Sequence, residues 1–207
     1  MTKHYDVTAL GEVLIDFTEN GSSAQGNPMY EANPGGAPCN VLAMLQKFGH
    51  KTAFLGKVGE DIFGRRLEIV LKEAGIDTAG LCMDPTVRTT LAFVEKKADG
   101  DRDFSFYRNP GADMMLRTEE LQEQILKDTR IIHFGTLSMT DEPVRSATRH
   151  AIETAKANGA MLSFDPNIRE PLWQSMEEAK RQTAYGMEVC DVLKISDNEI
   201  RWFTGEE

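Results

Sequence analysis

The sequence predicts an α/β fold in which a parallel sheet is covered by helices, with a small β-sheet attached to it. From Arg117 onward, apolar strand patterns alternate with amphipathic helical patterns, which is typical of successive βαβ units. Two glycine clusters nearer the N-terminus each precede a helical pattern. A pair of strand patterns, at residues 89–95 and 102–107, interrupts the alternation and predicts the small sheet.

Composition limits the classes of ligand and location. With 207 residues and 41% hydrophobic content, the chain can bury one sizeable core or a core with a small appendage. The net charge of 23 − 33 = −10 argues against a nucleic-acid or membrane-surface protein. Three scattered cysteines suit a reducing compartment, so we expect a cytoplasmic protein. No apolar run reaches the ~20 residues that span a bilayer.

The first strand pattern covers residues 7–10, and residues 12–17 continue it, with Asp16 at the far end. Asp16 therefore stands where a strand meets a loop. In an open α/β sheet this edge is where ligands bind, which makes Asp16 a candidate ligand contact. The alternative is a solvated loop acid. Residues 29–32 form another short strand pattern.

The first glycine cluster is the loop Asn33-Pro34-Gly35-Gly36-Ala37-Pro38-Cys39-Asn40. Gly35 and Gly36 lack Cβ atoms, so the backbone can approach a polyhydroxyl or phosphate group closely. A helix is expected over residues 41–48, and its first N–H groups are unpaired. An ordinary glycine loop before a packed helix is the alternative interpretation.

The second cluster, residues 56–64, follows a short strand at 52–55 and opens another helix. Neither cluster has the G-x-G-x-x-G pattern, and Lys57 precedes Val58 where a Walker loop needs Ser or Thr. A dinucleotide-binding dehydrogenase and a P-loop kinase are therefore disfavoured. Gly75 and Gly80 mark an expected turn.

The interrupting strand pair carries aromatic side chains and an arginine. Asp99-Gly100 between the strands is a hairpin signal. Alternation places Phe104 and Phe106 on one face, where they pack together or face a ligand. Arg108, just beyond, is a candidate sugar or phosphate contact, with a solvated arginine as the alternative.

The second half predicts helices at 118–126, 142–157 and 176–187 and strands at 131–135, 161–165 and 192–195. Parallel strands place the loops after them on one side of the sheet. Arg169, in the cluster Asp165-Pro166-Asn167-Ile168-Arg169, matches phosphate geometry, although a helix-capping turn is the alternative. In Lys194-Ile195-Ser196-Asp197-Asn198-Glu199, the acids are either site residues or first-turn acids that complement a helix dipole.

The loop Asn33 to Val41, followed by Gly56-Lys57-Val58-Gly59-Glu60-Asp61-Ile62-Phe63-Gly64, resembles the N-terminal signature of the PfkB (ribokinase-like) carbohydrate kinases. Within the family the chain is most similar to bacterial fructokinases, from the first strand to the last residue. The resemblance implies a three-layer α/β domain made of residues 1–12, 34–88 and 109–207. It also implies a β-sheet lid, residues 13–33 and 89–108, that closes over the sugar and forms a homodimer contact.

The implied reaction transfers the γ-phosphoryl group of ATP, with Mg²⁺, to a sugar hydroxyl, and fructose is the expected sugar. The implied substrate contacts are Asp16, whose carboxylate accepts two sugar hydroxyls, and Gly35, Gly36, Asn40, Phe106 and Arg108. The implied phosphate and metal residues are Arg169 for charge stabilisation, Asn167, Lys194 and Ser196 for the nucleotide, and Glu199 for Mg²⁺ through water. Ser196 stands where asparagine is commoner in the family.

The second signature of these kinases, G-A-G-D, supplies the general base and does not occur in this sequence, whose glycines after residue 160 are Gly186 and Gly205. We therefore expect the stretch to be an N-terminal segment of a kinase, and we predict no turnover from a chain that ends at Glu207. The alternatives are a kinase of the same family acting on 2-keto-3-deoxygluconate, ribose or a nucleoside, or a non-catalytic sugar-binding protein.

Overall fold

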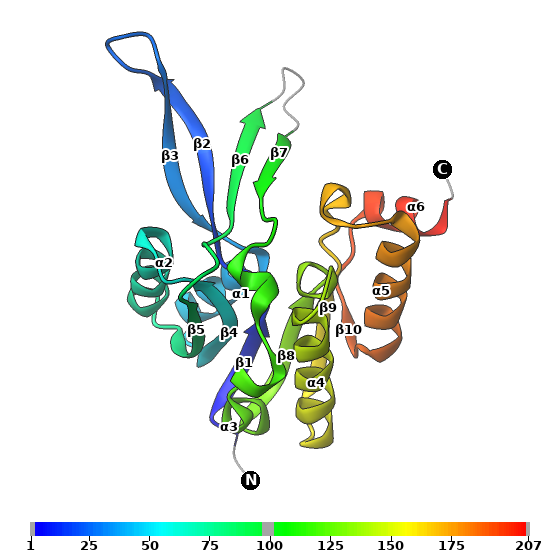
Figure 1. Cartoon of the computed structure of the whole chain (residues 1–207). Coiled ribbons are helices and arrows are strands. Elements are labelled where there is room, and N and C mark those ends of the chain that lie inside the picture. The colour runs from blue at the N-terminus through cyan, green and yellow to red at the C-terminus, as the bar shows by residue number, and fades with distance from the viewer. Residues whose placement is uncertain (1–2, 97–101, 206–207) are drawn as a thin grey trace.

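The computed structural model describes residues 3–96 and 102–205 in two connected sheets (Figure 1). The main sheet has the strand order β10-β9-β8-β1-β4-β5, and all of its pairings are parallel. Its strands are β1 (Tyr5–Leu10), β4 (Thr52–Gly59), β5 (Asp77–Asp84), β8 (Thr129–Gly135), β9 (Met161–Asp165) and β10 (Val192–Leu193). The α/β prediction with a parallel sheet is thus confirmed.

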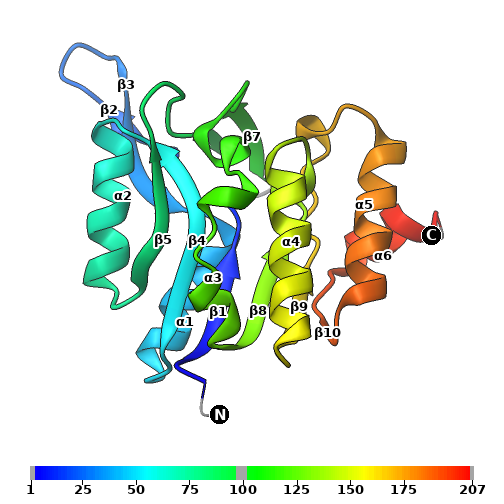
Figure 2. The same cartoon turned by 60° about the horizontal axis from the view of Figure 1, so that its bottom comes forward.

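Helices cover both faces of the main sheet (Figure 2). The helices are α1 (Ala37–Lys47), α2 (Ile62–Glu73), α3 (Glu123–Lys127), α4 (Val144–Ala157), α5 (Met176–Val189) and α6 (Asp197–Thr204). Side chains alternate along β1, so Val7 and Ala9 pack with α1 and α2 while Leu10 packs with α3 and α4. Two hydrophobic cores result, one on each side of the sheet.

The second sheet has the order β3-β2-β6-β7 and rises from the end of the main sheet where its strands finish (Figure 1). Its strands are β2 (Leu14–Ser22), β3 (Pro28–Gly35), β6 (Leu91–Lys96) and β7 (Arg102–Tyr107). β2 pairs antiparallel with β3 and parallel with β6, so the hairpins β2–β3 and β6–β7 lie side by side. The predicted Asp99-Gly100 turn lies outside the described residues.

Several predicted boundaries were wrong. Residues 12–17 do not continue the first strand, because β2 begins at Leu14 and belongs to the second sheet. Gly56 and Gly59 lie inside β4, where a Cβ at Gly56 would meet the ring of Phe54 and the backbone oxygen of Gly11. Close packing, and not a turn, requires that glycine.

The other corrections concern element lengths. Gly80 lies within β5, which the sequence pattern missed. α1 starts four residues earlier than expected, at Ala37, because Pro38 is well suited to a first turn. The expected helix at 118–126 is a 3₁₀ turn, Thr118–Glu120, followed by the short α3.

No helix in the described part of the chain is both long enough and apolar enough to cross a membrane.

Candidate functional site

A pocket opens where the carboxyl ends of the main-sheet strands meet the four-stranded sheet. Its volume is about 530 Å³, a size suited to a small ligand. Both sheets contribute to its lining, which consists of Glu12, Leu14, Asp16, Thr18, Asn33, Gly36, Ala37, Asn40, Val94, Phe104, Phe106, Leu137, Asn167 and Arg169. Because ligands of open α/β sheets bind outside the carboxyl ends of the strands, this pocket is the candidate site.

Asp16 enters the pocket from β2. Its neighbour Ile15 points the opposite way and is only 1% exposed, as strand alternation requires. On β3, Gly35 pairs with Leu14, and a Cβ at Gly35 would collide with the carboxylate of Asp16. Glycine therefore lets the loop lie this close to the acid without displacing the carboxylate of Asp16. The structure brings Asp16 and Gly35 together, as the sequence predicts.

Helix α1 starts at the pocket wall. Gly36 precedes it with φ +117°, a conformation that L side chains rarely adopt. A Cβ there would also lie 2.5 Å from the backbone oxygen of Glu12. Asn40, one turn along α1, is exposed and lines the pocket. The loop thus presents the Gly36 backbone and the Asn40 side chain to the same space.

Glu12 is a pocket residue that the sequence reasoning missed. Its side chain is almost fully buried, with the residue 4% exposed, and Oε1 accepts a hydrogen bond of 2.9 Å from the N–H of Ala37. Burial raises the pKa of Glu12 to about 7, and the hydrogen bonds from backbone N–H groups offset only part of this rise. One signal was available: Glu12 is the only charged residue in the apolar run from Val7 to Ile15.

Two aromatic rings and an arginine close one side of the pocket. Phe104 and Phe106 stack with ring centroids 5.9 Å apart, so the predicted packing on one face is confirmed. The guanidinium carbon of Arg169 lies 5.3 Å from the centroid of Phe104. Its Nη1 donates to the carbonyl oxygen of Ile168 at 2.9 Å. Arg169 therefore joins the loop after β9 to the four-stranded sheet across the pocket.

The loop after β9 is held in an uncommon conformation. Asn167 has φ 44°, in the left-handed region that asparagine tolerates better than most residues. The N–H and hydroxyl of Thr136 donate to the carbonyl oxygen of Pro166 at 3.2 and 2.6 Å, respectively. These bonds fix the loop so that the Asn167 side chain lines the pocket.

Lys194, Ser196 and Glu199 lie beside the pocket and are not part of its lining. The ammonium of Lys194 is 3.2 Å from Oδ2 of Asp165. Ser196 is the N-cap of α6, and it forms a capping box with Glu199, whose Oε2 accepts the Ser196 N–H at 2.9 Å. The helix-start alternative for Glu199 is therefore what the structure shows.

The carboxylate of Glu199 has little capacity left for a metal ion. It accepts two hydrogen bonds from Ser196 and one from the N–H of Ile168 at 3.0 Å. Although partial burial raises the pKa of Glu199, these bonds outweigh it and keep the pKa below its ordinary value. Since a carboxylate offers about four acceptor positions, the remaining one suits a metal-bound water. Across the described ranges, no group of three or more His, Cys, Asp or Glu side chains could hold a metal.

Arg108 was expected either to contact a sugar or phosphate or to lie in solvent, and the structure places it in the interior. Its side chain is 2% exposed, so the solvated alternative is wrong. Nε donates to Asp113 at 2.7 Å, Nη1 to the hydroxyl of Thr140 at 3.0 Å and Nη2 to the carbonyl oxygen of Leu137 at 2.9 Å. These bonds tie the end of β7 to Asp113 in the turn that follows it and to the segment after β8, and Arg108 does not line the pocket. This geometry gives no support to a sugar contact by Arg108.

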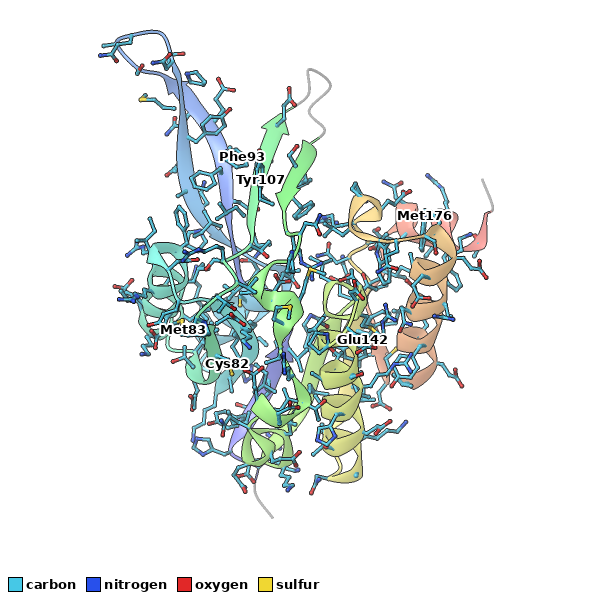
Figure 3. The ribbon with its side chains drawn as sticks, in the orientation of Figure 1. Cys82, Met83, Phe93, Tyr107, Glu142 and Met176 are labelled. Atoms are coloured by element: carbon cyan, nitrogen blue, oxygen red, sulfur yellow. The ribbon has the colours of Figure 1, made fainter. Side chains whose placement is uncertain are left out.

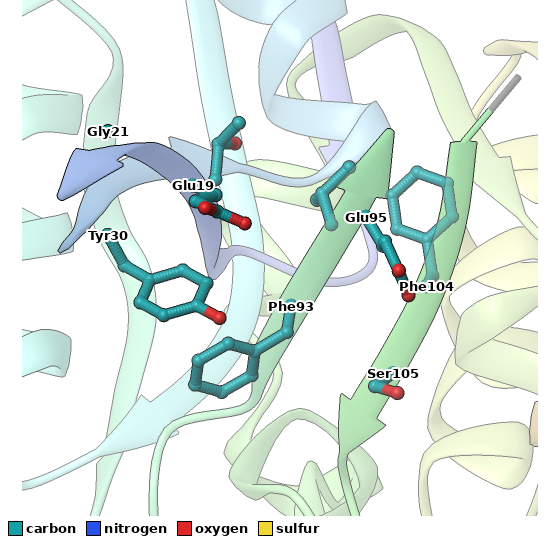
Figure 4. Close-up of a pocket in the computed structure, with 9 residues that line it drawn as sticks. Glu19, Gly21, Tyr30, Phe93, Glu95, Phe104 and Ser105 are labelled. Atoms are coloured by element: carbon teal, nitrogen blue, oxygen red, sulfur yellow. The ribbon is translucent and has the colours of Figure 1, made fainter. Parts of the chain in front are cut away.

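A second hollow, of about 610 Å³, lies over the outer part of the four-stranded sheet (Figure 4). Its lining comes from that sheet alone and comprises Thr18, Glu19, Gly21, Tyr30, Phe93, Val94, Glu95, Phe104 and Ser105. It contains neither the glycine loop nor any residue of the main sheet. The pocket lined by Asp16 and Gly36 is therefore the better candidate for the reaction site.

Comparison with known proteins decides the family. The model of the pfkB family carbohydrate kinases matches residues 5–207, nearly the whole chain. The chain belongs to the pfkB family of carbohydrate kinases. Two segments suggested this family. The first forms the pocket wall around Gly36, and the second is the connection from β4 to α2.

Among curated pfkB relatives, the chain is 44% identical to "Probable fructokinase-2" of Arabidopsis thaliana over 203 residues. It is 45% identical to "Fructokinase-1" of Zea mays over 201 residues. These alignments cover 97% and 96% of this chain, respectively, and 62% of each relative. The chain thus spans about three fifths of the length of the curated relatives it matches.

Solved structures of the same family agree. The fructokinase of Xylella fastidiosa superposes with a TM-score of 0.90 at 35% identity, covering 97% of this chain and 62% of that one. A fructokinase of Vibrio cholerae O395 with fructose, ADP and calcium bound gives a TM-score of 0.88 at 31% identity, covering 98% and 64%. The ribokinase-like fold and the resemblance to fructokinases are both confirmed.

Proposed function

We propose that the protein to which this chain belongs transfers the γ-phosphoryl group of ATP to a hydroxyl of fructose. One observation carries the proposal: a small-ligand pocket lined by Asp16, Asn33, Asn40, Asn167 and Arg169, in a chain 44% identical to a fructokinase over 97% of its length. Carboxylate and amide groups suit the many hydroxyls of a sugar. A related fructokinase structure contains fructose and ADP.

In this proposal the pocket residues bind and orient the two substrates. Asp16 accepts hydrogen bonds from two sugar hydroxyls, the Gly36 backbone and Asn40 contact the same sugar, and Phe106 packs against it. Arg169 offsets the charge of the phosphates, with Asn167 nearby. The bond between the γ-phosphorus and the β,γ-bridging oxygen of ATP breaks as the sugar oxygen bonds to that phosphorus, so ADP leaves with that oxygen, and the hydroxyl proton passes to a base.

The base and the metal lie outside this set. The G-A-G-D signature that would supply the base is not in the sequence of this stretch. Mg²⁺ would supply further charge neutralisation at the phosphates, with Glu199 holding it through water. Lys194 and Ser196, at the start of α6, are the proposed nucleotide-side residues. We place the protein in the cytoplasm because the three cysteines of this stretch are all free.

The four-stranded sheet is the proposed lid, formed by residues 13–33 and 89–108 over an α/β domain of residues 1–12, 34–88 and 109–207. Asp16, Phe104 and Phe106 bring this sheet into the pocket lining. The ion pair of Arg108 with Asp113 lies at its base, where the lid joins the domain. Closure of such a sheet would exclude water from the reacting phosphate.

The other side of the lid carries what we call the outer aromatic face, consisting of Phe17, Tyr30, Phe93 and Tyr107. Phe93 contacts the other three rings with centroid distances of 5.0 to 5.5 Å. Tyr30 and Tyr107 are 46% and 66% exposed, and Figure 3 shows Phe93 and Tyr107 together on the sheet. We propose that a second copy of the protein covers this face in a homodimer.

The test is ADP formation by the full-length protein with fructose, 2-keto-3-deoxygluconate, ribose and a nucleoside as acceptors. Fructose should give the highest kcat/KM. Asp16→Asn should raise the KM for fructose ~10-fold or more, because hydrogen bonds to a charged acceptor are lost, and should leave the KM for ATP unchanged. Glu19→Gln, on the same strand but outside the pocket, is the matched control. A higher kcat/KM with another acceptor would refute the choice of fructose, and sugar binding without ADP formation would leave only a binding protein.

A further inference from the structure

We propose that Glu12 is a positioning residue for the sugar: it holds the start of α1 so that the Gly36 backbone and Asn40 face Asp16. This inference rests on the function proposed above for the pocket. It concerns a residue that lies behind the sugar contacts and acts through them.

Helix α1 cannot cap its own start. Its N-cap residue is Gly36, which has no side chain, and its first turn contains no acidic residue. The second helical residue, Pro38, has no N–H group. The first helical N–H, at Ala37, is half-buried between the buried residues Gly36 and Pro38, and its acceptor comes from another part of the chain.

Glu12 supplies that acceptor. Its Oε1 lies 2.9 Å from the Ala37 nitrogen, and the residue is 4% exposed. An acceptor with negative charge at a helix N-terminus also favours the helix dipole. Burial of a carboxyl group is costly, as the pKa of about 7 indicates. An apolar side chain at this position would avoid that cost but would leave the Ala37 N–H unpaired.

The position of Glu12 in the chain connects two walls of the pocket. Four residues after it comes Asp16, on β2. Its backbone oxygen packs directly against Gly36, where no Cβ would fit, and also lies 3.9 Å from the sulfur of Cys39 on α1. Backbone packing and the Ala37 hydrogen bond therefore hold the glycine loop and the Asp16 strand at a fixed separation.

This arrangement predicts a specific loss when the acceptor is removed. Without it, the start of α1 can shift by a fraction of an ångström, and Asn40 shifts with it. Sugar affinity then falls, while the ATP side of the site is unaffected because its proposed residues lie in the loop after β9 and in the segment before α6. A purely structural role would instead lower stability and leave the sugar affinity of the folded protein unchanged.

The experiment compares three variants of the full-length protein. Glu12→Ala removes the acceptor, Glu12→Asp keeps the charge on a side chain too short to reach Ala37, and Glu12→Gln keeps a carbonyl oxygen at the right length. We expect Glu12→Ala and Glu12→Asp to raise the KM and the calorimetric Kd for fructose at least ~10-fold, which a lost charged hydrogen bond accounts for. We expect Glu12→Gln to stay within ~3-fold of wild type, and the KM for ATP to stay constant throughout.

The matched control is Asp84→Asn, which alters another buried carboxylate outside the pocket, paired with Lys57 at 3.1 Å. It should lower the unfolding midpoint and leave the KM for fructose unchanged. The proposal is wrong if folded Glu12→Asp keeps wild-type fructose affinity, if Glu12→Gln is as impaired as Glu12→Asp, or if Asp84→Asn weakens fructose binding equally. If the wild type prefers another acceptor, the proposed substrate fails, and the same comparison made with that acceptor tests Glu12 independently.

Discussion

At the residue scale, Arg108 and Asp113 form an ion pair whose side chains are 2% and 3% exposed. Thr90 donates its hydroxyl to the other carboxylate oxygen of Asp113 at 2.5 Å. Arg108→Ala would leave the carboxylate buried without its cation, so we expect a loss of ~3–5 kcal/mol in the free energy of unfolding. Chemical denaturation measures this loss. The double variant Arg108→Met with Asp113→Asn should recover part of it, and a loss below ~1 kcal/mol in the single variant would contradict the prediction.

The titration of Glu12 gives a second residue-scale prediction. Its pKa is about 7 in the folded protein against an ordinary value of 4.5, so the unfolded chain loses this proton first as pH rises. Stability from this group therefore falls between pH 4.5 and 7. As pH rises from 4 to 8, the free energy of unfolding of Glu12→Gln should therefore increase by on the order of 3 kcal/mol relative to that of the wild type.

Urea denaturation of both proteins across that range measures the difference. The neighbouring charges act in opposite directions, since Asp113 raises and Arg108 lowers the pKa of Glu12. A difference between the two proteins that stays constant with pH would show that Glu12 titrates normally.

Sequence reasoning located some pocket residues better than others. Asn40 is near a helix start and Asn167 follows a strand, and parallel topology brings such positions to one edge. Asp16 reaches the pocket differently from the prediction, because it lies within β2 of the second sheet and not at the end of the first strand. Arg108 also follows a strand, but its direction depends on Asp113 and Thr140, which the sequence pattern does not place. Three-dimensional partners, and not local pattern, decide whether an arginine faces a ligand or the interior.

At the element scale, helix α2 depends on a single capping residue that also holds the segment leading into β6. Asp61 accepts hydrogen bonds from the N–H groups of Phe63 and Gly64 at 3.0 and 2.8 Å, respectively. It also accepts the N–H and the hydroxyl of Thr89. Although partial burial raises the pKa of Asp61, these bonds outweigh it and keep the pKa below its ordinary value.

Asp61→Ala should therefore cost ~1–2 kcal/mol of unfolding free energy, as N-cap losses do. The neighbouring exposed acid provides the control, and Glu60→Ala should change stability by less than ~0.5 kcal/mol. Thermal or urea unfolding of the two variants measures both effects. Equal losses in the two variants would mean that the cap contributes nothing.

Element prediction failed where burial was incomplete or where glycines were frequent. β5 reads Asp77-Thr78-Ala79-Gly80-Leu81-Cys82-Met83-Asp84, in which Thr78 is the single residue of the β-branched type that favours strands, and it lies at the edge of the sheet. Gly80 was interpreted as a turn residue, but a Cβ there would collide with Leu55 on the neighbouring strand. By contrast, β8 and β9 were predicted within two residues, since both are central and strongly apolar.

At the scale of the whole molecule, the outer aromatic face predicts association. Sedimentation velocity of the full-length protein should show a dimer that dissociates on dilution. Tyr107→Glu, which places a charge at a side chain 66% exposed in the single chain, should give a monomer. Phe48→Glu alters an equally exposed aromatic residue at the end of α1, 71% exposed, and should leave the dimer intact. A Tyr107→Glu dimer of wild-type affinity would move the interface elsewhere.

The strand order also bears on how the protein forms during synthesis on the ribosome. β1 lies between β4 and β8, and Val7 pairs in register with Ile131. At a translation speed of ~5–20 residues per second, the 131 − 7 = 124 residues that separate this pair take at least ~6 s to emerge. Throughout that interval the nascent chain presents one unpaired side of its first strand, a template for wrong pairing. Chaperone demand should therefore be greatest before β8 leaves the exit tunnel.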